Sequence, residues 1–180
     1  SNITIDQIKE PLELELFHDG ISATVSVGGY DNIVQESSQC SPDQIVIIFW
    51  EVLATNENSL IECEQSTEEQ LEEFYFHITD SLKLVFKNLS SNKAVLFNRF
   101  SSNLSLNTAS QGSRFDTISA RLNNFLLEHK PENFILIDVE RVFKSIGVNK
   151  SIDWRNYYTA KAPYTINYFC AYAKFVMPTF

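Results

Sequence analysis

The sequence predicts one α/β domain, a three-layer α/β/α sandwich built around a parallel sheet. Short hydrophobic strands alternate along the chain with amphipathic helices, which is the order typical of parallel sheets with helices on both faces. The strand Gln44–Trp50 is continuously apolar after its first residue, as expected when a strand is covered on both faces. The chain has 180 residues and is 44% hydrophobic, which is enough for one well-formed core.

The first half of the chain contains two predicted helices and two predicted strands. The segment Ile8–His18 has its apolar residues at helical spacing, and Gly20 follows as a natural helix stop. Ile21–Val27 alternates and is rich in β-branched residues, which predicts a strand. Gln44–Trp50 is the second strand, and we expect it to be central and nearly fully buried. The amphipathic segment Thr67–Asn88 predicts a long helix.

The start of this long helix carries a capping signal. Ser66 and Glu69 are three residues apart, as in a capping box, where each side chain satisfies a backbone amide at the other position. Acidic residues gather in the first turns, where they favour the positive end of the helix dipole.

The second half continues the alternation of strands and helices. Lys93–Asn98 and Asn133–Asp138 are apolar runs that predict strands, and Arg114–His129 between them has helical periodicity. Ser151–Pro163 reads as a polar, aromatic-rich loop, and Tyr164–Met177 as the closing helix.

Composition excludes several classes of function. The formal net charge is −9 and no basic run is present, so general nucleic-acid binding is not expected. No apolar run approaches the roughly 20 residues of a membrane span. Cys40, Cys63 and Cys170 are far apart and form no CxxC motif, which argues against a disulfide framework and a zinc site. We therefore expect a cytoplasmic domain with reduced thiols and no metal ligands.

The opening of the chain raises a question of completeness. In doubly wound folds a strand normally precedes the first helix, but here only Ser1–Ile5 does. We expect the natural protein to extend upstream, with Ser1–Thr4 as the tail of a truncated first strand or the turn after it. A remnant of an expression tag at Ser1 and Asn2 is the alternative.

Candidate binding residues lie at the predicted carboxyl ends of the strands, where open α/β sheets bind their ligands. Gly29 belongs to a Gly-Gly turn that can bring backbone amides close to an anion, although most such pairs are simple turns. Glu51 and Asn98 end two apolar strands. A carboxylate such as Glu51 beside aromatic rings at a sheet edge is expected to have a raised pKa or to pair with a cation.

The loop Ser151–Pro163 offers charged side chains without a histidine. Arg155 and Lys161 can bind an anionic ligand, since Arg presents a planar fork and Lys a point charge. Alternatively, Asp153 pairs with Arg155 and holds the loop in place.

An acid-x-acid pattern at Asp138 and Glu140 superficially matches the DxDxT motif of haloacid-dehalogenase-type (HAD) phosphatases. Glu140 replaces the second aspartate, and no downstream lysine and acidic motifs follow. We therefore expect Asp138 to cap the helix that begins after it.

The order of these elements resembles the SGNH (GDSL-type) esterase and acetyltransferase fold, with its flavodoxin-like strand order. Placed on the family's motifs, Asn2 falls at the nucleophilic serine, with Ser1 one residue away, and Gly29 falls at the conserved glycine. Glu51 falls near the asparagine of the GxND turn, and the DxxH turn is replaced by the segment 159–165. The resemblance implies the fold without its catalytic triad, since a serine hydrolase needs a base and an orienting group.

A narrower resemblance is to the N-terminal domain of FkbH-like proteins. It covers Ile3–Glu36 and Leu122–Thr165, including the D-x-R…K-x-P-x-[ST] stretch that begins at Asp153. Members of that family join an SGNH-like domain to a C-terminal HAD-type domain and act in polyketide and surface-polysaccharide biosynthesis. Some load a glyceryl unit from a glycolytic phosphate onto a carrier protein.

The resemblance implies a single SGNH-like domain over residues 1–180, as a fragment of a longer protein. The first hypothesis is a non-hydrolytic accessory domain that presents a substrate or carrier protein to its HAD-type partner domain. It needs no cofactor of its own, because Mg²⁺ would belong to the HAD domain. Its partners are that domain and an acyl carrier protein or small anionic substrate, with no nucleic acid or membrane. The alternatives are an active esterase or acyltransferase with a divergent catalytic constellation, and a purely structural or dimerisation domain.

Overall fold

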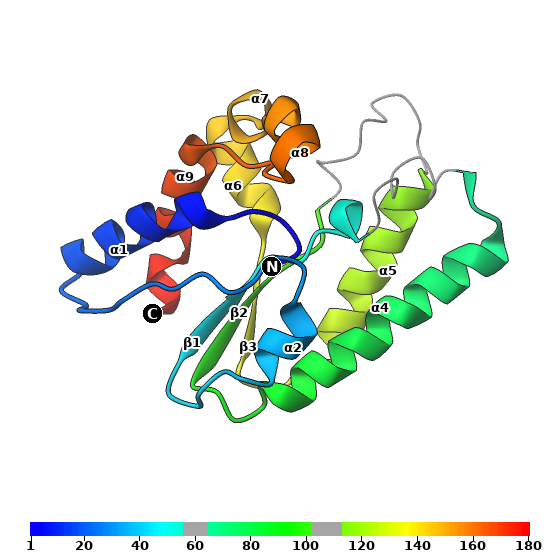
Figure 1. Cartoon of the computed structure of the whole chain (residues 1–180), viewed down its shortest axis with the longest axis horizontal. Helices are drawn as coiled ribbons and strands as arrows, with labels where there is room; N and C mark the ends of the chain where they lie inside the picture. The colour runs from blue at the N-terminus through cyan, green and yellow to red at the C-terminus, as the bar shows by residue number, and fades with distance from the viewer. Residues whose placement is uncertain (56–64, 102–112) are drawn as a thin grey trace.

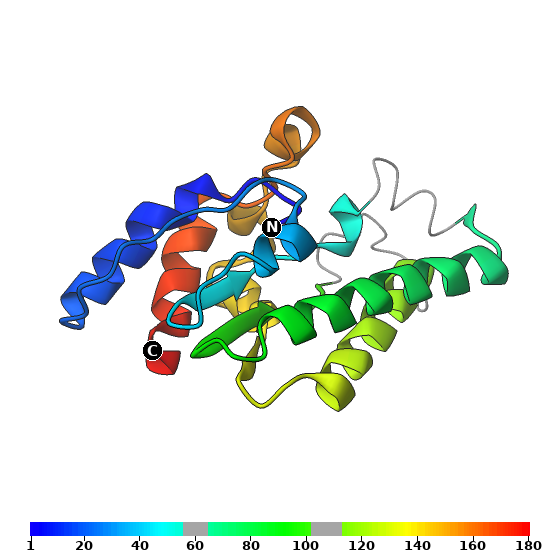
Figure 2. The same ribbon diagram turned by 60° about the horizontal axis from the view of Figure 1, so that its bottom comes forward.

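A parallel β-sheet forms the middle layer of the fold. A computed structural model describes residues 1–55, 65–101 and 113–180. Helices α1 (Lys9–His18) and α9 (Ile166–Val176) lie on one side of the sheet, and α4 (Glu68–Asn88) and α5 (Arg114–His129) lie on the other (Figures 1 and 2). This arrangement is the predicted three-layer α/β/α sandwich.

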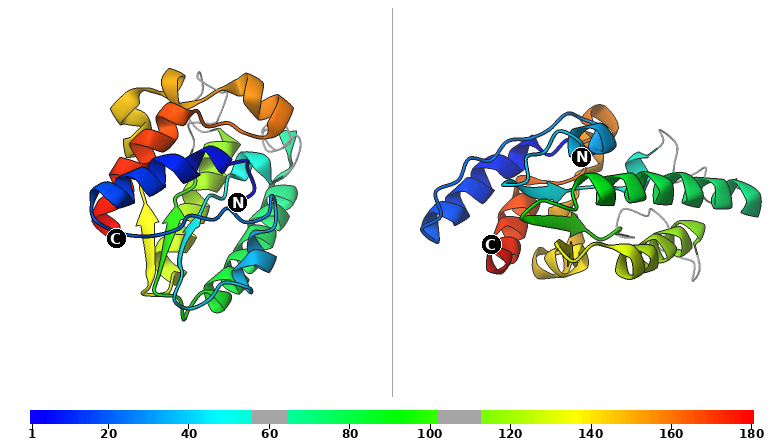
Figure 3. Two further views of the ribbon diagram at one scale, coloured as in Figure 1. Left: turned by 60° about the vertical axis from the view of Figure 1, so that its left-hand side comes forward. Right: turned by 90° about the horizontal axis from the view of Figure 1, so that it is seen from below.

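Among the described residues, the sheet has three parallel strands in the order β1-β2-β3, side by side in the left view of Figure 3. They are β1 (Ile45–Ile48), β2 (Ala94–Asn98) and β3 (Phe134–Ile137). In register, Ile47 of β1 lies opposite Leu96 of β2. The central strand β2 is the best buried, because helices cover both of its faces and strands cover both of its edges.

Four predicted helices are confirmed within two residues at each end, and shorter helices join them. The remaining helices in the described part of the chain are α2 (Ile33–Ser37), α6 (Val139–Ile146), α7 (Val148–Ser151) and α8 (Trp154–Ala160). Helices α6, α7 and α8 gather beyond the carboxyl ends of the strands (Figure 1). Single 3₁₀ turns occur at Asp6–Ile8, Val52–Ala54 and Met177–Thr179.

The capping box of α4 is present one residue later than predicted. The Thr67 hydroxyl accepts a hydrogen bond from the backbone N–H of Gln70, and the Thr67 N–H donates to the Gln70 side chain. The predicted pair Ser66 and Glu69 was wrong because Thr67-x-x-Gln70 satisfies the same spacing rule, with Gln in place of Glu.

Two strand predictions were wrong. Ile21–Val27 forms no strand in the structure, because none of the described strands pairs with it. Among the described strands β1 lies at an edge of the sheet instead of its centre, and Ile45, Val46 and Ile47 are only half-buried.

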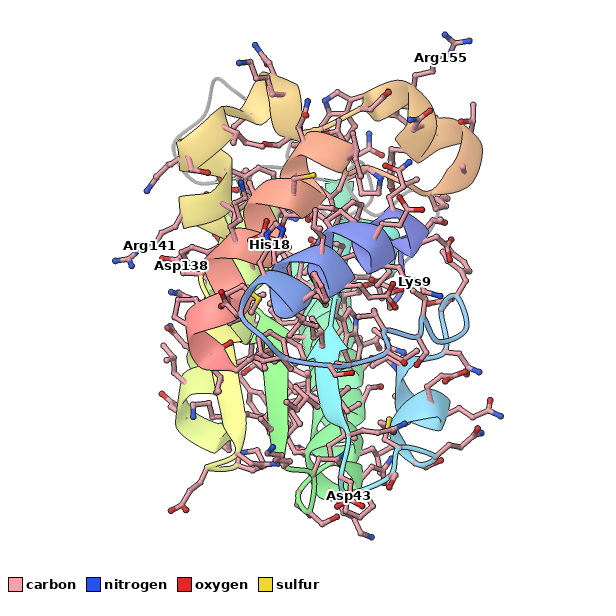
Figure 4. All side chains as sticks on the ribbon, turned by 90° about the vertical axis from the view of Figure 1, so that its left-hand side faces the viewer. Lys9, His18, Asp43, Asp138, Arg141 and Arg155 are labelled. Carbon is pink, nitrogen blue, oxygen red and sulfur yellow. The ribbon has the colours of Figure 1, made fainter. Side chains whose placement is uncertain are left out.

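Two local predictions in the second half also need correction. The segment Ser151–Pro163, predicted to be a loop, contains α8, whose first turn is capped by the Asp153 side chain. Asp138 precedes α6 but makes no capping bond. Its carboxylate lies 3.7 Å from the Arg141 guanidinium instead. The two residues are labelled next to one another in Figure 4.

The described residues also bear on the membrane and cysteine predictions. No helix among them is long and apolar enough to cross a bilayer. Cys40 and Cys170 are unpaired thiols, and Cys63 lies outside the described residues. No group of three or more His, Cys, Asp or Glu side chains in the described ranges is arranged to hold a metal ion.

Candidate functional site

At the carboxyl edge of the sheet, the first four residues bond to the segment before α2, to the end of α8 and, through Asn2, to the turn after β1. The Ser1 carbonyl accepts a hydrogen bond from the Asp31 N–H at 2.8 Å. The Thr4 N–H donates to the Lys161 carbonyl at 2.8 Å, and the Thr4 hydroxyl donates to the Ala160 carbonyl at 2.7 Å. The start of the chain is therefore anchored both to the segment before α2 and to the end of α8.

Asn2 binds the backbone of Glu51 through both ends of its side-chain amide. Its Nδ2 donates to the Glu51 carbonyl at 2.8 Å, and its Oδ1 accepts from the Glu51 N–H at 2.7 Å. Only 2% of Asn2 is exposed. A carboxamide is not an esterase nucleophile, and both ends of this one bind the Glu51 backbone, so Asn2 acts as a clamp on the turn that follows β1.

The Glu51 carboxyl is buried among aromatic rings. Its Oε1 is 2.5 Å from the hydroxyl of Tyr164, and only 2% of the residue is exposed. Burial raises the pKa of Glu51 to about 8; the bond from Tyr164 opposes this shift, and nearby Glu140 adds to it. Glu51 is therefore mainly protonated at neutral pH. The direction of this shift agrees with one of the two expectations for Glu51, whereas the other, a pairing with a cation, was wrong because the carboxyl contacts the Tyr164 hydroxyl.

Three tyrosines spaced four residues apart line this edge. The rings of Tyr164 and Tyr168 stack with centroids 4.2 Å apart, and those of Tyr168 and Tyr172 are 6.0 Å apart. The Tyr172 hydroxyl donates to Oδ1 of Asn98 at 2.7 Å. Burial raises the pKa of each of the three phenols, so they stay protonated at neutral pH.

Two buried polar groups in this cluster are unsatisfied. The Tyr168 hydroxyl and Nδ2 of Asn98 have no hydrogen-bond partner within the described residues. Buried polar atoms are normally paired, so such groups mark a place where a water molecule or a ligand atom can bind. Beside them, the Ser101 hydroxyl donates to the Glu140 carboxylate at 2.8 Å.

The charged residues predicted for anion binding do not converge. Arg155 is exposed on α8 and points away from the body of the protein (Figure 4). Asp153 accepts a hydrogen bond from the Asn156 N–H and caps α8. The Nζ atom of Lys161 lies 5.0 Å from the centre of the Tyr157 ring, within the range of a cation–π contact. In the sequence Lys161 lies three residues before Tyr164, but the contact of its ammonium group is with a ring of α8.

The other predicted site residues are occupied by local contacts. The Gly29 N–H donates to the Glu36 carboxylate at 3.1 Å, so the anion bound by the Gly-Gly turn is a side chain of the protein itself. An added Cβ at Gly28 would come within 2.9 Å of the same carboxylate. The Ser1 hydroxyl donates to the Ile3 carbonyl at 2.7 Å.

None of the three histidines reaches this edge as a catalytic base. His18, His77 and His129 are all exposed residues of α1, α4 and α5. The His129 ring stacks on Phe125 of its own helix, with centroids 4.3 Å apart. The described residues therefore form no nucleophile–histidine–acid arrangement, because among them no histidine is placed to activate a serine.

Sequence reasoning missed the tyrosine cluster as a polar feature. The predicted closing helix Tyr164–Met177 contains Tyr164, Tyr168 and Tyr172, but no role was predicted for their hydroxyls. The available signal was their spacing of four residues, which aligns hydroxyls along one helix face. Glu51 and Asn98, at the ends of two parallel strands, are the polar groups that this face meets.

Comparison with known proteins gives a match at the level of structure. No known family profile matches the chain, and no curated protein matches it significantly. Its fold is similar to that of the N-terminal part of the protein BF1531 from Bacteroides fragilis, a crystal structure containing a phosphatase domain complexed with Mg. The TM-score is 0.69 at 12% sequence identity, and the match covers 98% of this chain and 48% of the other. The likeness shows a shared fold, and the chain spans about half the length of that neighbour.

Proposed function

We propose that this chain is a non-hydrolytic domain that presents a substrate or carrier protein to a partner catalytic domain of the HAD phosphatase type. The observation that carries the proposal is the set of bonds at the carboxyl edge of the sheet. Asn2 is fixed to the Glu51 backbone, and the Glu51 carboxyl contacts Tyr164. The residues that would perform hydrolysis in this fold are thus committed to holding the edge together.

The likeness to the N-terminal part of a phosphatase-containing protein supports the partner assignment. The sequence resemblance to FkbH-like proteins suggests the same arrangement, an SGNH-like domain ahead of a HAD-type domain. In this proposal the Mg²⁺ chemistry belongs to the partner domain. The pathway would be biosynthetic, for a polyketide or a surface polysaccharide, and we place the protein in the cytoplasm, where Cys40 and Cys170 would stay reduced.

The substrate class favoured by this proposal is a small anionic molecule, free or attached to a carrier. Lys161 is half-buried beside Tyr157, and its carbonyl is tied to Thr4. Its backbone is therefore joined to the first residues of the chain, and its positive charge lies over the Tyr157 ring. A point charge of this kind suits a phosphate or carboxylate group.

Substitution of Lys161 tests this assignment. With glycerol 3-phosphate as the probe, Lys161→Ala is expected to weaken binding about tenfold, equivalent to about 1.4 kcal/mol, because one charge-assisted contact is lost. The melting temperature should change by less than about 2 °C, since the backbone bond of Lys161 to Thr4 remains. Titration calorimetry and a thermal melt measure the two quantities.

The matched control is Lys144→Ala, which removes an exposed lysine of α6. It should change neither affinity nor stability. If both variants weaken binding equally, the effect comes from the change in net charge and not from the position of Lys161. A large loss of stability in Lys161→Ala would show that this lysine is structural. The absence of any binding to the parent chain would contradict the assignment.

A further inference from the structure

Two buried polar atoms without a hydrogen-bond partner lie outside the tyrosine cluster. They are Nε of Arg99 and Oγ of Ser119, and neither has a partner within the described residues. Ser119 is only 2% exposed. Buried polar groups are normally paired, and an unpaired one often marks the place of an ion or ligand atom. The candidate site described above uses neither residue, so this second pair needs its own explanation.

Arg99 is a half-buried cation without an acidic partner. It follows β2, and its N–H donates to the Ile137 carbonyl of β3 at 3.0 Å, so its backbone continues the ladder. None of the ion pairs and cation–π contacts in the described ranges includes its guanidinium. Arginine is rarely buried unless it is paired. The chain has 23 acidic residues, yet none of those described pairs with this arginine, which leaves its guanidinium open to an anion from outside.

The direction of the Arg99 side chain follows from its neighbour in the strand. Asn98 points towards α9, because its Oδ1 accepts a hydrogen bond from the Tyr172 hydroxyl. Consecutive residues of an extended chain point to opposite faces of the sheet. Arg99 therefore points to the other face, which α4 and α5 cover (Figure 2).

Asn123 of α5 places Ser119 at the same position. Its side-chain Oδ1 accepts from the Phe100 N–H, and its Nδ2 donates to the Phe100 carbonyl, both at 2.9 Å. Residues four apart lie on the same face of a helix. Ser119 is thus one turn nearer to the start of α5 on the face that meets the end of β2. Its buried hydroxyl lies on the side of the sheet to which Arg99 points.

The chemistry of this pair suits an oxyanion. A guanidinium presents a planar fork of N–H donors, and a serine hydroxyl adds a further donor. Such forks bind phosphate and carboxylate groups through two parallel hydrogen bonds. The start of α5 faces the carboxyl edge of the sheet, where the helix dipole favours negative charge and where open α/β sheets bind ligands.

We propose that Arg99 and Ser119 form a binding site for a phosphate or carboxylate group, on the face of the sheet that α4 and α5 cover. The guanidinium binds two oxygens of the group, and the Ser119 hydroxyl donates to one of them. The site is separate from Lys161, whose ammonium group lies over the Tyr157 ring. The inference does not depend on the proposed function.

The Nε–H signal of Arg99 in an NMR spectrum tests the proposal. It is assigned as the arginine signal that Arg99→Lys removes. Inorganic phosphate and acetate are titrated separately into the 180-residue chain, with sodium chloride holding the ionic strength constant. We expect a saturable shift with a dissociation constant on the order of 1 mM. A response to phosphate alone would identify a phosphate site, and a response to acetate alone a carboxylate site.

Three variants separate the site from general electrostatics, with the amide signals of Phe100 and Ala120 reporting binding. Arg99→Gln should weaken binding about tenfold, because the charged fork is lost. Ser119→Ala should weaken it about threefold without lowering the melting temperature, because the hydroxyl has no partner in the free protein. Arg141→Gln is the matched control, since it removes an exposed guanidinium of the same charge, and it should leave the affinity unchanged.

Four outcomes would overturn the proposal. One is an Arg99 signal that neither anion moves in a saturable way. Another is equal weakening by Arg99→Gln and Arg141→Gln, which would attribute binding to net charge. If Arg99→Gln does not fold, Arg99→Lys decides, because lysine keeps the charge without the fork, and parental affinity in that variant would contradict the site. Finally, Lys161→Ala should leave the Arg99 response unchanged, and its loss would place the anion at Lys161 instead.

Discussion

Replacing Glu51 with glutamine is expected to remove a pH dependence of stability on the order of 5 kcal/mol, at about 1.4 kcal/mol per pKa unit. The folded protein holds the Glu51 proton up to a pKa of about 8, and the unfolded chain releases it near 4.5. Between these values the folded state binds more protons, so the free energy of unfolding falls as pH rises. The contribution is fully present below pH 4.5 and is lost as pH passes 8.

Urea unfolding of both proteins at pH 5 and pH 8.5 measures this difference. Glutamine keeps an oxygen that can accept from the Tyr164 hydroxyl but has no carboxyl proton to lose. The variant should therefore be close to the parent protein at pH 5 and more stable at pH 8.5. If the two stability curves stay parallel across this range, Glu51 does not titrate as its burial requires.

The second large effect is expected at Asn2. Asn2→Ala leaves the buried N–H of Glu51 without its partner, at about 1–3 kcal/mol, whereas the Glu51 carbonyl loses one donor but still accepts from the Ala54 N–H and the Thr55 hydroxyl. We expect a loss of about 2 kcal/mol in the free energy of unfolding, measured by urea denaturation.

The neighbouring Ser1→Ala is the matched control for this substitution. It removes only the hydroxyl bond to the Ile3 carbonyl and should cost less than about 1 kcal/mol. Asn2→Asp keeps the acceptor for the Glu51 N–H but buries a carboxylate against the Glu51 carbonyl, so at neutral pH it should cost at least as much as Asn2→Ala. A stability loss for Asn2→Ala no larger than that for Ser1→Ala would show that the clamp contributes little.

The helices α4 and α5 could be predicted from sequence because their apolar residues recur at helical spacing along 16 or more residues. Their periodicity is a local property and needs no knowledge of neighbours. Strand pairing is not local. Ile21–Val27 has the composition of a strand but no described partner, and β1 has the composition of a central strand but lies at an edge. Both errors concern which segments lie next to one another, a feature that composition does not encode.

The candidate site was predictable in position and less so in chemistry. Parallel topology places Glu51 and Asn98 at one sheet edge, and the structure gives both a tyrosine partner there. The sequence could not show that α8 would form and carry Arg155 outward. The direction of a side chain on a short helix depends on how that helix is docked, which is a property of the assembled fold.

The most direct test of the account is hydrolysis of p-nitrophenyl acetate by the purified chain, alongside Ser1→Ala and Glu51→Gln. A working serine or carboxyl site in this fold would need the first residues and the Glu51 turn to reach substrate, yet here they are bonded to one another. We predict no turnover above the buffer rate in any of the three proteins. Turnover by the parent chain that either substitution abolishes would contradict the account and identify an active hydrolase.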